Sequence, residues 1–180
     1  MNLYYNPDVL NKAGVDPESI TDWDSLNSAI EKVVNAGYKG ITFSGISGEE
    51  GTFQFLPWFW GAGGQLKDAS GSSAEQDALD LVSGWVQKGW APKSVATDNQ
   101  SAAWDLFLGG DYGFSETGSW QMESAVEKGY KMISIPAKDG GVAPVPSGGE
   151  FITIPAQKTK DSDKMKATAE VIQCLIDGDN

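Results

Sequence analysis

Short strand-like runs alternate with longer helical segments along this chain, and this alternation restricts the possible folds more than any other feature. Each run is only a few residues long and is rich in β-branched or aromatic side chains. The runs are Leu3–Tyr5, Lys39–Phe43, Tyr112–Glu116, Met132–Ile135 and Phe151–Ile154. Because strands that alternate with helices are typical of α/β domains, we expect an α/β fold in which helices pack around a small mixed or partly parallel sheet.

The helical segments are marked by apolar stripes and by glycines that end them. In the clearest case, Trp23, Leu26, Ile30 and Val33 follow one another at spacings of three and four, and Gly37 ends the helix. The preceding residues Thr21–Asp24 resemble a capping box in which Asp24 replaces the usual glutamate. Four further helices are predicted over Ser73–Gly89, Asp98–Gly109, Ser119–Gly129 and Ser162–Ile176. Phe53–Gly61 is expected to be another helix, although its aromatic residues also suit a strand.

The length of the chain, 180 residues, fits one ordinary domain. A chain of this size buries roughly 70% of the surface that it exposes when unfolded, so it needs no disulfide or metal to hold a core. We see no internal repeat, and we expect residues 1–180 to form a single domain. Cys174 is the only cysteine, which excludes an internal disulfide, and its position opposite the apolar stripe of the last helix predicts that it is partly exposed.

The charged residues exclude several classes of function. The chain has 25 acidic residues and 13 basic ones, a net charge of −12, and no histidine. Every basic residue is a lysine. Nucleic-acid binding requires a basic face, and a histidine triad or histidine-ligated zinc site requires histidine. We therefore expect no nucleic-acid partner, no metal and no cofactor.

The aromatic content is the most informative part of the composition. Seven tryptophans, five tyrosines and seven phenylalanines make up 11% of the chain. Flat rings at the junctions of loops and helices can stack on the apolar faces of sugar rings. Trp23 and Trp85 lie on helical stripes and are expected in the core. Trp120 follows a Gly118-Ser119 turn, where ligand contact and simple packing are equally compatible with the sequence.

Several carboxylates lie in predicted loops or at strand ends, namely Glu49-Glu50, Glu116 and Glu150. A glycosidase needs two such groups about 5–10 Å apart, and the sequence provides no such distance. Solvated surface charge is the simpler interpretation. Gly61–Gly64 superficially resembles a dinucleotide-binding loop, but Leu66 stands where the third glycine is required.

Several short motifs follow one another along nearly the whole chain. They are Tyr4–Leu10, Lys12–Gly14, Asp16-Pro17, Trp23–Leu26, Phe55–Trp58, Gly63-Gly64, Phe107–Phe114, Gly118–Trp120, Ile135-Pro136, Gly148-Gly149, Ile152–Ile154 and Ala167–Leu175. Their order resembles that of one protein family, the extracellular solute-binding proteins of sugar ABC importers (family 1, maltose-binding-like).

This resemblance implies a periplasmic-binding-protein type II fold, of which residues 1–180 would be the second, C-terminal lobe without the first. It implies non-catalytic binding of a sugar or oligosaccharide for delivery to an ABC importer. The partners would be the carbohydrate and, in the full-length protein, the ABC permease subunits. The location would be extracellular or periplasmic and associated with the cell surface, with membrane attachment only through an N-terminal lipid anchor that precedes this segment. The isolated segment could dimerise through the surface that its partner lobe would cover.

The resemblance also implies which residues bind the ligand. Trp120 matches the ring that stacks on the sugar in this lobe. The loop that enters the aromatic helix matches Thr52 and Phe53, with Glu50 as a carboxylate. Gly148, Gly149 and Glu150 match a turn close to the ligand, where glycine permits close approach of the backbone. Trp58 is a further candidate that is equally suited to the core.

Two other functions remain open from the residues. One is a glycan-processing enzyme that uses two of the same carboxylates. The other is an interaction domain whose aromatic residues all lie in the core. Incubation with oligosaccharides separates the binder from the enzyme, and tryptophan fluorescence against a panel of sugars separates the binder from the interaction domain.

Overall fold

The structure, a computed structural model, describes residues 1–68, 70–159 and 161–178. The chain divides into two units, Met1–Pro146 and Ser147–Asn180, and each is described by itself. That residues 1–180 form one lobe of a larger receptor stays a prediction at this point. No described helix combines the length and the hydrophobicity that crossing a membrane requires.

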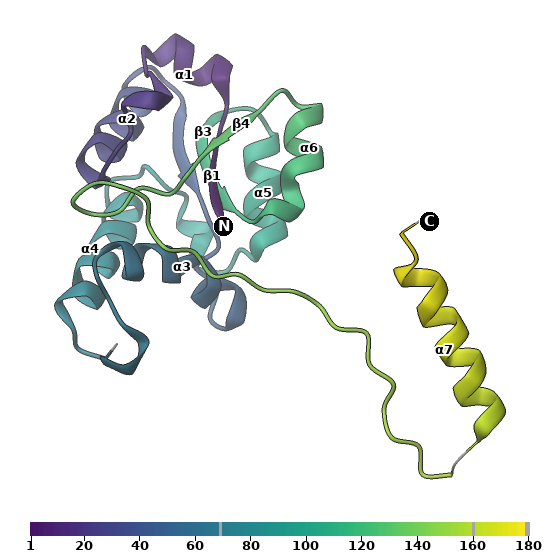
Figure 1. Ribbon diagram of the computed structural model, residues 1–180. Coiled ribbons are helices and arrows are strands. Elements are labelled where there is room, and N and C mark those ends of the chain that lie inside the picture. The colour runs from purple at the N-terminus through teal and green to yellow at the C-terminus, as the bar shows by residue number, and fades with distance from the viewer. Residues whose placement is uncertain (69, 160, 179–180) are drawn as a thin grey trace. The chain divides into compact units, whose positions relative to one another are not determined.

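The first unit is built on a four-stranded mixed sheet (Figure 1). The strands are β1 (Asn2–Tyr5), β2 (Lys39–Thr42), β3 (Tyr112–Thr117) and β4 (Lys131–Ile133). They lie in the order β2-β3-β1-β4. β2 runs parallel to β3, whereas β1 is antiparallel to both β3 and β4. The expected α/β class with a small mixed sheet is therefore confirmed.

Helices cover both faces of this sheet (Figure 1). They are α1 (Pro7–Ala13), α2 (Trp23–Asn35), α3 (Glu49–Gly61), α4 (Ser73–Gln87), α5 (Gln100–Leu108) and α6 (Met122–Glu127). Short 3₁₀ turns occupy Pro17–Ser19, Leu66–Asp68, Lys93–Ala96 and Ser119–Gln121. The segment Phe53–Gly61, which also suited a strand, is helical. The sequence patterns did not single out α1, although Asn6 caps it and Pro7 opens it, both of which are helix-start signals.

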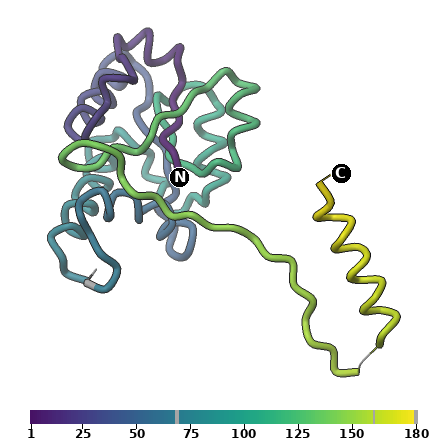
Figure 2. Tube along the Cα trace, viewed as in Figure 1, coloured from purple at the N-terminus to yellow at the C-terminus, as the bar shows by residue number. Residues whose placement is uncertain are grey.

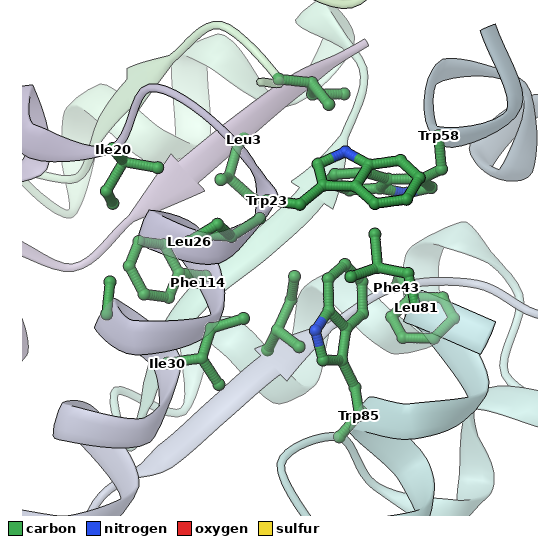
Figure 3. Packing of buried hydrophobic residues seen from close by; sticks show 14 of the residues in the cluster. Leu3, Ile20, Trp23, Leu26, Ile30, Phe43, Trp58, Leu81, Trp85 and Phe114 are labelled. Carbon is green, nitrogen blue, oxygen red and sulfur yellow. The ribbon is translucent and has the colours of Figure 1, made fainter. Parts of the chain in front are cut away.

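Two apolar clusters hold these layers together. In the larger one, α2, α3 and α4 pack against the sheet around Trp23, Trp58 and Trp85, whose rings meet edge to face (Figure 3). The smaller cluster joins β1 and β3 to α5 and α6. Its buried members are Tyr4, Trp104, Phe107, Tyr112 and Ala125. Because successive side chains of a strand point to opposite faces, β1 contributes residues to both clusters.

The start of α2 differs in detail from the expectation. The N-cap is Asp22, whose side chain accepts a hydrogen bond from the Ser25 backbone N–H at 2.7 Å. The Ser25 hydroxyl in turn accepts from the backbone N–H of Asp22 at 3.0 Å. The capping box is therefore formed by Asp22 and Ser25, and Asp24 is not its second member. A serine hydroxyl can fill the position usually held by glutamate because it also accepts hydrogen bonds.

The segment after β4 folds back on itself within the first unit (Figure 2). Pro136 and Val142 form an antiparallel bridge, and the Trp23 indole N–H donates to the Pro136 carbonyl at 3.1 Å. The Lys138 ammonium lies 2.7 Å from an Asp77 carboxylate oxygen. These contacts attach the end of the unit to α2 and α4.

In the second unit, α7 (Ser162–Ile176) occupies the range that the sequence predicted. The predicted strand Phe151–Ile154 is wrong, since these residues adopt neither strand nor helix and Phe151 is 89% exposed. A β-branched segment becomes a strand only where a neighbouring strand pairs with its N–H and C=O groups, and these residues form no such ladder in the part of the chain that the structure describes. Cys174 is exposed, as predicted.

Candidate ligand-binding surface

Most of the predicted binding residues of the first unit lie at one edge of the sheet. Because β2 and β3 are parallel, their carboxyl ends lie at the same edge, where open α/β sheets commonly bind ligands. β2 leads through a short loop into α3, whose first two turns carry Glu50, Thr52 and Phe53. β3 leads through Gly118 into the turn that carries Trp120.

Phe53 and Trp120 lie against each other at this edge. Their ring centroids are 6.5 Å apart and their planes are inclined at 43°. Trp120 is 53% exposed, whereas Phe53 is half-buried. The two rings therefore present a partly exposed apolar surface, which is the kind of surface that stacks on flat apolar faces of ligands. The sequence placed these two rings in separate motifs, and the fold brings them together.

Gly118 leaves the space that the Trp120 ring occupies. A Cβ atom at Gly118 would lie 2.0 Å from the Trp120 indole, a separation that two carbon atoms cannot adopt. The φ angle of Gly118 is −88°, so glycine serves here to let the indole approach closely and not to permit an unusual backbone conformation. The indole consequently lies directly against the backbone of residue 118.

Two polar side chains lie in the same first turns of α3 as Phe53. The Glu50 carboxylate accepts a hydrogen bond from the Gln100 backbone N–H at 2.6 Å, at the start of α5. The Thr52 hydroxyl donates to the Gly48 carbonyl at 2.8 Å and is exposed. Carboxylate oxygens have several acceptor positions, so Glu50 can hold α5 and still accept from a hydroxyl group.

Trp58 lies in the core and has no exposed surface. Its indole N–H donates to Oε2 of Glu116 at 2.8 Å, and its ring packs edge to face against Trp23 and Trp85 (Figure 3). A ring without exposed surface has no face to offer a ligand. We therefore assign Trp58 to packing and leave it out of the candidate surface.

Glu116, near the end of β3, is an acidic residue in the interior of the protein. It is fully buried, and its Oε1 atom has no hydrogen-bond partner among the described residues. Burial raises the pKa of its carboxyl group to about 8, and the hydrogen bond from Trp58 and the nearby N-terminal ammonium only partly oppose this. Glu116 is thus mainly protonated at neutral pH. The strand pattern could have revealed its burial, because it shares a sheet face with Phe114 two residues earlier.

Gln54, which the sequence patterns did not single out, ties α3 to both parallel strands. Its side-chain oxygen accepts a hydrogen bond from the Ser44 backbone N–H. Its side-chain nitrogen donates to the Glu116 carbonyl at 3.2 Å. Because Gln54 directly follows Phe53, this buried amide helps to fix the first turns of α3 relative to the sheet.

Gly148, Gly149 and Glu150 belong to the second unit, where all three are exposed. The structure brings Phe53 and Trp120 of the first unit together, and Glu50 and Thr52 lie on the same helix as Phe53. A ligand role for each of these residues is a proposal, argued below.

A recess in the first unit lies away from this surface. Its volume is about 440 Å³, and its lining includes Asn6, Lys12, Tyr38, Lys128 and Tyr130. Asn6 follows β1 directly, at the opposite end of that strand from the Asn2–Thr117 pair next to Gly118. Within the described ranges, no group of three or more acidic, histidine or cysteine side chains could hold a metal ion.

Comparison with known families decides the identity of the fold. All of residues 1–180 match the sequence profile of a family described as bacterial extracellular solute-binding protein. The chain belongs to that family. The family is one of solute-binding proteins, not of enzymes, and its extracellular character implies a periplasmic or extracellular location.

Solved structures of sugar-binding proteins share the fold. The maltose-bound MalE3 of T. maritima is 28% identical, with a TM-score of 0.68 over 79% of this chain and 39% of that protein. A solute-binding protein from Thermotoga lettingae TMO, bound with alpha-D-tagatose, is 20% identical, with a TM-score of 0.65 over 76% of this chain and 39% of its own. The cyclic alpha-maltosyl-1,6-maltose binding protein from Arthrobacter globiformis is 22% identical, with a TM-score of 0.64 over 79% and 38%.

These neighbours are periplasmic-binding-protein type II sugar binders, so the expected fold family is confirmed. The chain spans about two fifths of the length of each of these three solved structures.

Proposed function

We propose that this chain is the second lobe of a two-lobed receptor that binds a sugar or oligosaccharide without chemical change and delivers it to an ABC importer. The family is extracellular and solute-binding, and MalE3, the 28% identical neighbour, was solved with maltose bound. That the chain matches about two fifths of its neighbours' length supports the assignment to one lobe.

The observation that carries this proposal is the exposed aromatic pair of Phe53 and Trp120 at the carboxyl edge of the parallel strands. Sugar rings have apolar C–H faces and polar hydroxyl edges. The pair offers rings for the faces, and the Glu50 carboxylate and the Thr52 hydroxyl lie on the same helix for the edges. We include Gly148, Gly149 and Glu150 as further proposed contacts, on the basis of the resemblance alone.

One lobe alone should bind its sugar weakly. Two-lobed receptors gain affinity by closing both walls on the ligand, which buries most of it and excludes water. With one wall, each ring contributes on the order of 1 kcal/mol beyond area burial. This must offset at least about 4 kcal/mol of lost ligand freedom. We expect a Kd near or above about 1 mM, which corresponds to about −4 kcal/mol.

The structure disfavours the two other functions that the sequence left open. A glycosidase needs two accessible carboxyl groups, but Glu116 has no exposed surface, and the family that the whole chain matches is one of solute-binding proteins. An interaction domain with only core aromatics does not fit Trp120, which is 53% exposed. The proposed role is therefore binding without catalysis.

The remaining partners follow from the same proposal. In the full-length protein, the ABC permease subunits would receive the sugar, and a lipid anchor preceding this segment would attach the receptor to the cell surface. The isolated segment would dimerise weakly through the exposed aromatic pair, since a patch that a partner lobe normally covers favours association.

The test is a titration of this chain with maltose, laminaribiose, raffinose and a chitin oligosaccharide. NMR spectra serve as the readout, because they detect weak binding. At least one sugar should shift the signals of Trp120 and Phe53, and Trp120→Ala should abolish the effect. Leu79→Ala is a matched control, since Leu79 is a large apolar residue that is 45% exposed on α4.

Two outcomes of that titration would contradict the proposal. Micromolar binding by this chain would mean that the site is complete without a second lobe. Cleavage of the oligosaccharide, checked by chromatography after prolonged incubation, would mean that the protein is an enzyme.

A further inference from the structure

The turn that carries Trp120 is held at its first residue by a buried tyrosine. The Gly118 carbonyl accepts a hydrogen bond from the Tyr4 hydroxyl at 3.1 Å. The same carbonyl accepts from the Gln121 backbone N–H at 3.2 Å, which closes the 3₁₀ turn around Trp120. Because the indole lies directly against Gly118, whatever holds the Gly118 backbone also sets the position of that ring.

The far end of the turn is held by a buried tryptophan. The Trp104 indole N–H donates to the Ser124 hydroxyl at 3.0 Å. The Ser124 hydroxyl donates in turn to the Gln121 carbonyl at 3.1 Å. This chain of hydrogen bonds links α5 to the start of α6, and both helices lie on the same side of the sheet (Figure 1).

Tyr4 and Trp104 also fix each other. Their rings meet edge to face with centroids 5.2 Å apart, and their exposed fractions are 1% and 3%. A buried tyrosine or tryptophan normally satisfies its polar atom with a nearby acceptor. Here the Tyr4 hydroxyl bonds to the Gly118 carbonyl at the start of the turn, and the Trp104 indole bonds to the Ser124 hydroxyl, which itself donates to Gln121 at the end of the turn. Burial raises the pKa of the Tyr4 phenol above its usual value, so the phenol stays protonated and remains a donor at neutral pH.

We propose that Tyr4 and Trp104 are positioning residues for ligand binding, which hold Trp120 in the orientation that it needs to stack on the ligand. This inference rests on the proposed function for its biological meaning. It also accounts for the hydrogen bonds by which the polar atoms of Tyr4 and Trp104 lead to the turn after β3. Neither residue touches the ligand in this scheme, since both are buried.

The chain offers a matched pair of variants. Tyr4→Phe removes only the hydroxyl that donates to Gly118. Tyr130→Phe removes a hydroxyl that donates to the Phe107 carbonyl at 3.5 Å, and Tyr130 packs against the same smaller core. Both variants keep the aromatic ring, so they differ mainly in whether the lost bond belongs to the Trp120 turn.

The experiment incorporates 5-fluorotryptophan and follows the fluorine NMR signal of Trp120, assigned by its loss in Trp120→Phe. We expect this signal to shift or broaden in Tyr4→Phe and to stay in place in Tyr130→Phe. Ser124→Ala should also move it, because it cuts the second link. An unchanged Trp120 signal in both Tyr4→Phe and Ser124→Ala would overturn the inference.

A titration with maltose separates this inference from the proposed function. If the sugar binds, Tyr4→Phe should weaken the binding by about fivefold, the loss expected for one hydrogen bond, and Tyr130→Phe should leave it unchanged. Equal weakening by both variants would contradict positioning by Tyr4. If no sugar in the panel binds even to the unaltered chain, the proposed function fails, and the fluorine spectra alone decide the positioning of Trp120.

Discussion

Helices α2 and α7 have similar N-terminal caps but differ in how much of their surface is buried. Each follows an aspartate, Asp22 or Asp161, whose side chain accepts hydrogen bonds from the first turn. Each carries an apolar stripe at helical spacing. Yet α2 buries Trp23, Leu26, Ala29, Ile30 and Val33, whereas no residue of α7 is buried.

The difference shows what a helical pattern does and does not specify. Caps and apolar spacing locate a helix, but most helical stability in proteins comes from packing of the apolar face. α2 obtains this packing from the sheet and from α3 and α4 in the first unit. In α7, the stripe residues Met165 and Ile176 are 39% and 61% exposed, so this stripe finds no packing partner within its own unit.

The largest expected effect comes from truncating one isoleucine in each helix. Ile30→Ala should lower the free energy of unfolding of the first unit by about 2–5 kcal/mol, because Ile30 is fully buried and its loss leaves a cavity. Ile176→Ala should change it by less than about 0.5 kcal/mol, as for other surface sites. Urea denaturation followed by tryptophan fluorescence measures both. Similar losses in the two variants would show that α7 is packed as tightly as α2.

The second prediction compares how a buried glutamate, Glu116, and an exposed one, Glu170, affect the pH dependence of stability. Since the pKa of Glu116 is about 8 in the folded state against an ordinary value of 4.5, its contribution to stability is complete below pH 4.5 and is lost as the pH rises to about 8. Glu116→Gln, which keeps an acceptor for Trp58, should therefore raise stability by a few kcal/mol above about pH 8, and the gain should shrink toward pH 4.5.

Glu170→Gln on α7 is the control for this prediction, since Glu170 is exposed. Denaturation curves at several pH values should show a flatter pH dependence for Glu116→Gln only. A pH profile that Glu116→Gln leaves unchanged would show that the carboxyl group is ionised at neutral pH.

The smallest expected change in stability comes from removing the N-cap side chains of α2 and α7. Asp22→Ala should cost about 1 kcal/mol of the stability of the first unit, the usual loss for an N-cap. Asp161→Ala should leave that stability unchanged and should instead increase amide hydrogen exchange in the first turn of α7. Hydrogen exchange with mass spectrometry, combined with thermal unfolding, measures both. A fall in the melting temperature with Asp161→Ala equal to that with Asp22→Ala would contradict the comparison.

Much of the fold could be predicted because its signals are local. The spacing of apolar residues, the capping side chains and the terminating glycines all act within a few residues of one another, so α2, α4 and α7 were placed close to their observed bounds. The strand Phe151–Ile154 was not, because a strand depends on a partner that local sequence does not reveal.

The candidate surface was predictable only in part. Glycine turns and aromatic residues pointed to Trp120 and Phe53 separately, but their contact depends on the parallel pairing of β2 with β3. Trp58 looked similar to Trp120 in sequence, and only packing separates a fully buried ring from one that is 53% exposed.

The sequence by itself determined the α/β class, the positions of most helices, and the absence of histidine, arginine and a second cysteine, which excludes whole classes of chemistry. Tertiary structure decided which apolar stripes find a partner, which rings stay exposed, and that Glu116 lies in a medium where its charge is costly. The physical reason is that periodicity and capping are local properties of the chain. Burial, electrostatic environment and the meeting of Phe53 with Trp120 depend on segments far apart in sequence.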